Sequence, residues 1–266
     1  MSRKYPPEQP SGRLGTRKLR LIGMGVFPER EPETEHLIFI PQHYEPGYAY
    51  PLLVWLHGPG SDEEQLLRIM PLVSLRNYLA VAPRGLRQIT DRGQAIYSWP
   101  QTPEGIDYAQ AAVAHAIRTV CSRYHVAEDR IFLAGFDLGG TMALRLALEE
   151  PWRFAGAASL GGAFPTWGRP FALLRQQRQL SFLLLSGAYS ERFSPEEACR
   201  ALKLLHQAGI SVILRQYSCG DQMHQGMLAD LNRWIMGQVT GQNPFDGSTS
   251  PCGQVRKPIL RRPAEG

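Results

Sequence analysis

The sequence predicts an α/β protein with a doubly wound, mostly parallel sheet of about eight strands and no separate lid domain. Short apolar stretches alternate along the chain with longer stretches of helical periodicity, which is the order of elements in a sheet of parallel strands joined by helices. Several apolar stretches, such as 52–56 and 182–185, are apolar at every position. Strands that helices cover on both faces have this pattern.

The predicted elements follow from these patterns and from their flanking turn residues. Ser61 with Glu64 resembles a capping box, Ser194 precedes Pro195 at a first helical position, and Gly209 lies where a helix would stop. The stretch 162–179 is long enough only for a loop or one short helix. The strand candidates are Leu19–Phe27, His36–Ile40, Pro51–Leu56, Tyr78–Ala82, Arg130–Phe136, Ala155–Leu160, Leu180–Ser186 and Ser211–Tyr217. The helix candidates are Asp62–Arg76, Ile106–His125, Gly140–Glu149, Pro195–Ala208 and Gln225–Val239.

Composition and charge predict one domain, 19–240, between two disordered tails, 1–18 and 241–266. The net charge is +5, and the excess lies in the tails: residues 1–20 hold six basic and one acidic side chain, and 241–266 hold four and two. Neither tail combines aromatic with basic residues in a recognised binding pattern, so no nucleic-acid partner is expected. No secretory signal and no apolar run of membrane-spanning length is visible, so we expect no membrane association and a cytoplasmic location.

A strand, a glycine-rich turn and a helix follow one another around position 137, where the turn reads G-F-D-L-G-G at 135–140. This is the pattern of a nucleophile elbow, in which small residues let strand and helix pack closely. Together with L-V-W-L-H-G-P-G at 53–60 and A-P-R-G at 82–85, it makes the chain resemble the phospholipase/carboxylesterase branch of the α/β-hydrolases, which includes acyl-protein thioesterases. The resemblance covers about residues 36–238 and implies the α/β-hydrolase fold and an ester-like substrate.

The resemblance also implies a serine, an acid and a histidine on three successive loops, and this chain departs from the family at each. The serine position is Asp137. The acid position, in a G-x-x-D pattern after the next-to-last strand, is Ser190, with Glu191 one residue later. The histidine position, directly after the glycine that follows the last strand, is Asp221, and the nearest histidine is His224.

The loop H-G-x-G at 57–60 carries a fourth departure. In the family, the N–H of the x residue is one of two oxyanion donors, but here x is Pro59, which has no N–H. Loss of one donor costs about 2.7–4 kcal/mol of transition-state stabilisation, while the Leu138 N–H can remain. His57, Gly58 and Trp99 are expected at the pocket. His57 is favoured as a packing residue with a hydrogen bond beneath the loop, and Trp99 either lines the pocket or anchors a long loop.

These residues leave several functions open. The favoured hypothesis is a pseudo-hydrolase that has lost ester hydrolysis and binds a small molecule or a protein partner. The alternative is a hydrolase in which Asp137 is the nucleophile, His224 the base and Glu191 the orienting acid, as in epoxide hydrolases and haloalkane dehalogenases. The absence of a cap domain from the sequence pattern weighs against it. In a third hypothesis, Asp137 and Asp221 face each other and share a proton or recruit a cation or an amine.

Each candidate also has a purely structural interpretation. Asp137 is a carboxylate at a helix N-terminus, where negative charge is electrostatically favourable. Asp221 can cap the last helix, and His224 can be a surface residue at its start. Glu191 is expected to be solvated or paired with Arg192. The histidines show no metal-ligand spacing, so no metal and no cofactor are expected.

Overall fold

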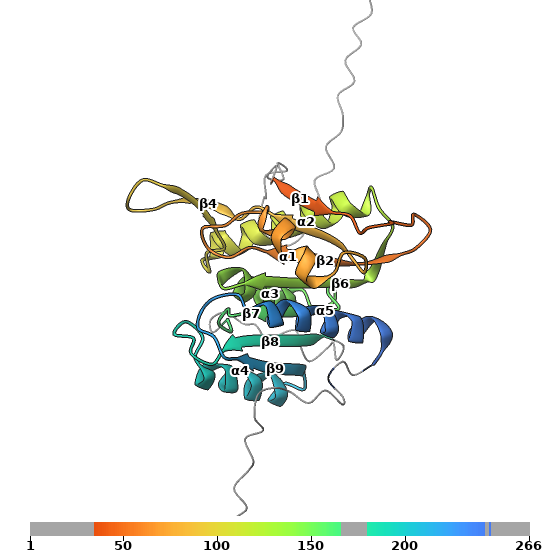
Figure 1. The fold of residues 1–266 in the computed structure, drawn as a ribbon. Coiled ribbons are helices and arrows are strands. Elements are labelled where there is room, and N and C mark those ends of the chain that lie inside the picture. The colour runs from red at the N-terminus through yellow and green to blue at the C-terminus, as the bar shows by residue number, and fades with distance from the viewer. Residues whose placement is uncertain (1–34, 166–179, 243–244, 246–266) are drawn as a thin grey trace, which may run out of the picture. The chain divides into compact units, whose positions relative to one another are not determined.

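The computed structural model describes residues 35–165, 180–242 and 245, all of them in one compact unit (Figure 1). Its main sheet has seven strands in the order β1-β3-β2-β6-β7-β8-β9. Strand β1 is antiparallel to β3, and every other neighbouring pair is parallel. The strands are β1 (His36–Phe39), β2 (Tyr50–Leu56), β3 (Leu79–Pro83), β6 (Val126–Phe136), β7 (Gly156–Leu160), β8 (Ser181–Gly187) and β9 (Ser211–Tyr217).

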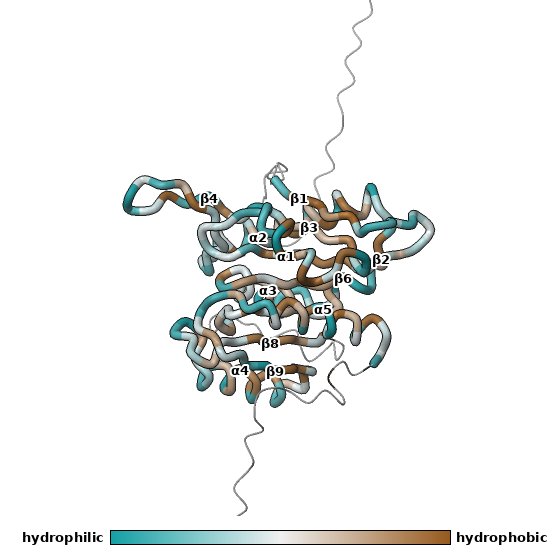
Figure 2. The backbone as a smooth tube through the Cα atoms, in the orientation of Figure 1, coloured by the Kyte–Doolittle hydropathy of each residue, from teal (hydrophilic) through white to brown (hydrophobic). Residues whose placement is uncertain are grey.

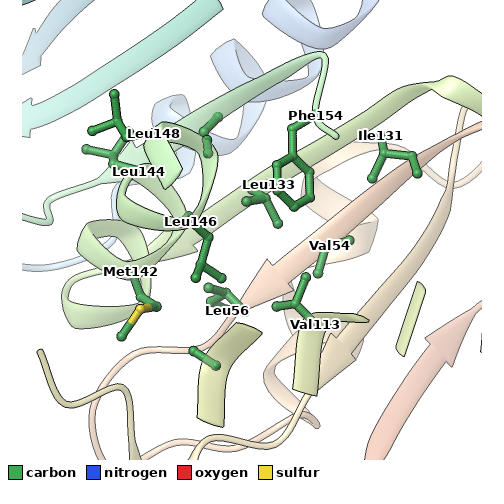
Figure 3. Close-up of a cluster of buried hydrophobic side chains, with 14 of the residues drawn as sticks. Val54, Leu56, Val113, Ile131, Leu133, Met142, Leu144, Leu146, Leu148 and Phe154 are labelled. Carbon is green, nitrogen blue, oxygen red and sulfur yellow. The ribbon is translucent and has the colours of Figure 1, made fainter. Parts of the chain in front are cut away.

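Helices cover both faces of the sheet. Alternate residues of each strand point to opposite faces, so Val54 belongs to the core covered by α2, α3 and α4, while Trp55 belongs to the core covered by α1 and α5. Figure 3 shows the first of these two cores, in which Leu56 of β2 and Leu133 of β6 lie beside Leu146 of α3. The helices are α1 (Gln65–Val73), α2 (Pro103–Cys121), α3 (Leu138–Glu149), α4 (Pro195–Gln207) and α5 (Gln225–Thr240).

Burial explains the apolar runs that predicted the fold. Every residue of β2, β3, β7 and β8 is buried. Figure 2 shows the hydrophobic residues along β8, within the sheet. Since both sheet faces are covered, no position in these strands is available to a polar side chain without cost. The predicted fold class, a mostly parallel doubly wound sheet, is therefore confirmed.

Most predicted elements are confirmed, with shifted ends. Helix α2 begins at Pro103 rather than Ile106, because the Thr102 side chain caps it by accepting a hydrogen bond from the Gly105 N–H. Helix α4 begins with the predicted Ser194 cap, and Gly209 follows its end with a φ of +74°. Strand β6 begins at Val126 rather than Arg130. The predicted strand 19–27 and residues 166–179 of the predicted loop lie outside the described residues.

Two predictions differ from the structure. The capping box at Ser61 is wrong: α1 begins at Gln65, and Ser61 instead accepts a hydrogen bond from the Arg68 side chain. The segment 86–98 was not expected to be a strand pair, but β4 (Leu86–Ile89) and β5 (Ala95–Ser98) form an antiparallel hairpin outside the main sheet (Figure 1). Gly93, with a φ of +74°, supplies the left-handed residue of its turn.

The strand order places two loops at the point where the winding of the sheet reverses. From β2 the chain crosses to β3 on one side, and it later returns to β6 on the other side of β2. In sheets of this kind, the crevice at the carboxyl ends of the two strands that flank the reversal is the usual ligand site. Here these ends are followed by the loop 57–60 and by Asp137.

Candidate functional site

Asp137 lies in the sharp turn between β6 and α3, with a φ of 52° and a ψ of −122°. A non-glycine residue with positive φ is strained, so surrounding contacts must hold it there. Its N–H donates to the Leu160 carbonyl oxygen at 2.9 Å, and its carbonyl oxygen accepts from the Thr141 N–H at 3.0 Å. These backbone bonds fix the direction in which the Asp137 side chain leaves the turn.

Glycines make this turn possible through close approach rather than through their own φ angles. A Cβ atom on Gly139 would collide with the carbonyl oxygens of Leu56 and His57, at the end of β2. A Cβ atom on Gly135 would collide with the backbone of Gly139. Only glycine therefore lets the start of α3 lie directly against strands β2 and β6, as the elbow pattern predicted.

The carboxylate of Asp137 forms an ion pair with the guanidinium of Arg192. The Asp137 side chain is 11% exposed and the Arg192 side chain is 60% exposed, so the arginine covers the carboxylate from the solvent side. Arg192 lies in the loop between β8 and α4, 55 residues further along the chain. Sequence reasoning expected Glu191 to be solvated or paired with Arg192; the structure leaves Glu191 exposed and pairs Arg192 with Asp137.

Ser190 and Asp221 are brought together beside the elbow. The Ser190 hydroxyl donates to the Asp221 carboxylate at 2.5 Å and accepts from the Phe193 N–H at 3.0 Å. The Arg192 backbone N–H also donates to Asp221, at 3.3 Å. The Ser190 hydroxyl is the main cause that holds the pKa of Asp221 below its ordinary value, because it stabilises the charged form. Arg192 thus contacts Asp221 through its backbone and Asp137 through its side chain.

Substituting Ser190→Ala is expected to raise the pKa of Asp221 toward its ordinary value. A carboxyl with a folded-state pKa below its unfolded value contributes stability above the unfolded value, and this contribution disappears as the pH falls through the folded value. The stability difference between wild type and Ser190→Ala should therefore shrink on acidification below about pH 4. Side-chain NMR titration of Asp221 measures the shift, with Ser122→Ala as the control. An unchanged Asp221 titration in Ser190→Ala would contradict the role of the hydroxyl.

His224 is the N-cap of α5, a position for which Asp221 was considered; that interpretation of Asp221 is wrong. The Nδ1 of His224 accepts from the Gly226 N–H at 3.1 Å, and its exposed ring lies 5.5 Å from the Tyr217 ring. With Nδ1 accepting, the neutral ring carries its proton on Nε2, so neither nitrogen has a lone pair available while the cap is formed. Among the described residues, the hydrogen bonds and ring contacts of His224 do not reach Asp137.

His57 has both ring nitrogens engaged beneath the loop 57–60. Its Nδ1–H donates to the Gly58 carbonyl oxygen at 2.8 Å, and its Nε2 accepts from the Gly85 N–H at 2.9 Å. Complete burial lowers the pKa of His57 and keeps the ring neutral. The Trp99 ring, which is also fully buried, lies 5.4 Å away. Both residues join the loop to the protein interior, and neither presents its side chain to solvent.

The loop 58–60 offers no free N–H group toward the elbow. The Gly58 N–H donates to the Gln65 side chain at 3.2 Å, and the Gly60 N–H donates to the Tyr97 carbonyl oxygen at 3.1 Å. Pro59, which is exposed between them, has no N–H. The N–H of Leu138 belongs to the first turn of α3, where backbone N–H groups lack partners within the helix. An oxyanion at this site could receive a hydrogen bond from Leu138 but none from the loop.

Other features bear on binding. A mainly apolar cavity of about 290 Å³ lies between the segment after β7 and helix α4, and its described lining includes Phe164 and Phe193. No group of three or more metal-ligating side chains occurs among the described residues. Within the same residues, no helix is long and apolar enough to cross a membrane. Sequence reasoning missed Arg192 and the cavity, since neither has a local sequence signal.

A sheet of this order, with a strained residue between strand and helix at its point of reversal, defines an α/β-hydrolase fold. The chain belongs to the family described as “Putative esterase”, whose model matches residues 30–209. The curated protein “Putative esterase NocK” of Nocardia uniformis subsp. tsuyamanensis is 32% identical over 126 residues, which are 44% of this chain and 34% of that protein. The chain therefore spans about a third of the length of this relative.

Several solved structures share the fold. Acyl-protein thioesterase 2 of Zea mays superposes with a TM-score of 0.62 at 17% identity, covering 77% of this chain and 99% of that one. SOBER1 of Arabidopsis thaliana gives a TM-score of 0.61 at 20% identity, covering 72% and 100%. The Bacillus cereus carboxylesterase gives 0.61 at 17% identity, covering 78% and 95%. The predicted resemblance to carboxylesterases and acyl-protein thioesterases is confirmed at the level of family and fold.

Proposed function

We propose that this esterase-family chain lacks serine-type ester hydrolysis and uses the elbow site to bind a small molecule or a protein partner. One observation carries the proposal: the side chain at the elbow is a carboxylate held by a guanidinium, Asp137 by Arg192. A serine esterase needs a hydroxyl there, activated by an imidazole that removes its proton. A carboxylate is already ionised and is a weak nucleophile toward esters, and an ion pair weakens it further.

The neighbouring contacts support the same conclusion. Ser190 and Asp221, which the resemblance places at the acid and histidine positions, are in contact, as an acid and a histidine would be in a triad. Neither can act as a general base toward a serine as an imidazole does near neutral pH. The loop 58–60 adds no oxyanion donor, because its two glycine N–H groups are engaged and Pro59 has none.

The decisive assay compares purified wild type with Asp137→Ala on p-nitrophenyl acetate and butyrate. We expect both proteins to match the uncatalysed rate. Hydrolysis by wild type that Asp137→Ala abolishes would overturn the proposal, whereas equal hydrolysis by both would mark a contaminating esterase. The alternative, Asp137 as nucleophile with His224 as base, predicts that ¹⁸O from labelled water enters Asp137 after turnover of an epoxide or haloalkane. We expect no such label, because the α5 cap engages His224, the base that this alternative requires.

A further inference from the structure

We propose that the elbow site is a receptor for an amphipathic amine, with the ammonium group on Asp137 and the apolar group in the cavity beside it. This inference rests on the proposed function, since it takes the site to bind rather than to hydrolyse. The cavity of about 290 Å³ is lined, among the described residues, by the apolar side chains of Ala163, Phe164, Phe193, Ala201 and Leu204. A volume of this size accepts a six-carbon chain or a single ring.

The walls of the cavity begin next to the contacts of Asp137. Phe193 directly follows Arg192, whose guanidinium lies on the Asp137 carboxylate. In the segment after β7, a Cβ atom on Gly162 would collide with the Asp137 carbonyl oxygen, and Ala163 follows that glycine. Each wall therefore begins one residue, about 3.8 Å along the chain, from a residue that contacts Asp137. An amphipathic amine would have its ammonium group and its apolar group on these two neighbouring features.

The present cation on Asp137 can be displaced. Because the Arg192 side chain is mostly exposed, its release to solvent costs little, as for other ion pairs with an exposed partner. The Asp137 carboxylate is almost buried and needs a cation when Arg192 leaves. A ligand ammonium supplies that charge, and its apolar group adds the burial of hydrophobic surface that Arg192 does not provide.

The surrounding charges favour a cation over an anion. Asp221 and Glu191 lie in the loops beside Arg192, and Glu197 with Arg200 line the edge of the cavity. With Asp137, these groups are four carboxylates against two guanidinium groups. A carboxylate ligand would meet this excess of negative charge, and an ester carbonyl would find no donor on the loop 58–60. The charge pattern therefore favours binding of an amine over binding of an ester or a carboxylate.

Isothermal titration with n-hexylamine, hexanoate and hexanol at pH 7.5 tests this inference. We expect hexylamine to bind wild type at least about tenfold more tightly than hexanoate or hexanol, and Asp137→Asn to lose about tenfold or more of that affinity. Arg192→Gln removes the competing cation and should strengthen hexylamine binding by about two- to fivefold. Ala201→Phe should fill the cavity and weaken hexylamine binding. Glu196→Gln, which removes an exposed carboxylate from the same helix, is the matched control and should change little.

The result that overturns the amine receptor is equal hexylamine affinity in wild type and Asp137→Asn, with both proteins giving the same melting temperature. Binding of hexanoate as tight as that of hexylamine would overturn it as well. Failure of the proposed function looks different, because it appears as Asp137-dependent hydrolysis of p-nitrophenyl esters. Absence of amine binding in a protein that hydrolyses no ester would sink only the amine receptor.

Discussion

The variant that combines Asp137→Ser, Ser190→Asp and Asp221→His is expected to hydrolyse p-nitrophenyl butyrate, whereas Asp137→Ser alone stays at the uncatalysed rate. The single variant provides a hydroxyl with no imidazole to activate it. The triple variant places an acid beside a histidine. These two residues lie in the loops where the Ser190 hydroxyl oxygen and a carboxylate oxygen of Asp221 are now 2.5 Å apart. Members of a triad act as a unit, so the gain should appear only when all three are present.

The size of the gain should reflect the missing oxyanion donor. Because Pro59 has no N–H and the neighbouring glycines are engaged, we expect the triple variant to be about 10²–10³-fold less active than an enzyme with both donors. Pro59→Ala in the triple background restores an N–H and should raise kcat. The measurement is kcat for p-nitrophenyl butyrate, with a thermal melt to verify folding. A folded triple variant at the uncatalysed rate would contradict the assignment of these three positions.

Gly139→Ala is expected to destabilise the protein by about 3 kcal/mol or more, the largest stability effect predicted for one substitution here. The added methyl group would collide with the carbonyl oxygens of Leu56 and His57. Overpacking costs about 1–3 kcal/mol where side chains can adjust, and here the obstacle is the backbone of a central strand. The whole of β2 is buried between two helical layers, so it cannot move away.

Urea denaturation of wild type and Gly139→Ala gives the free energy of unfolding directly. Gly47→Ala is the matched control, since a Cβ atom on Gly47 meets no other atom within 4 Å. We expect the control to change stability by less than about 0.5 kcal/mol, as is usual for open surface positions. A loss below about 1 kcal/mol in Gly139→Ala would show that α3 can move away from β2, contrary to the close packing described.

Much of the fold could be predicted from the sequence because it depends on local patterns. Strand β2 and the central residues 182–185 of β8 are apolar at every position, and both strands are buried throughout, so the apolar runs in the sequence mark the buried strands. The Ser194 cap and the turn at Asp137 were likewise readable within a few residues. The hairpin β4–β5 was missed because its strands are short and only partly buried, which weakens the alternation that marks a strand.

The candidate site was only half predictable, because its electrostatics depend on distant residues. The flanking glycines predicted that residue 137 lies in the elbow turn. Its ion-pair partner Arg192 is 55 residues further along the chain, and the sequence suggested that Arg192 pairs with its neighbour Glu191. His224 could be placed near the end of β9, yet only the structure shows its Nδ1 capping α5. The engaged N–H groups of Gly58 and Gly60 also depend on tertiary contacts, with Gln65 and Tyr97.

The glycines at 135 and 139 are required by the contact between backbone segments, whichever side chain stands between them. The turn therefore needs these glycines in order to fold, whether or not residue 137 takes part in catalysis. A G-x-x-x-G pattern between a strand and a helix is thus a requirement of the fold, and it is compatible with catalytic and non-catalytic chains alike. Under the proposed function, the residues that would distinguish the two kinds of chain are those at positions 137 and 221.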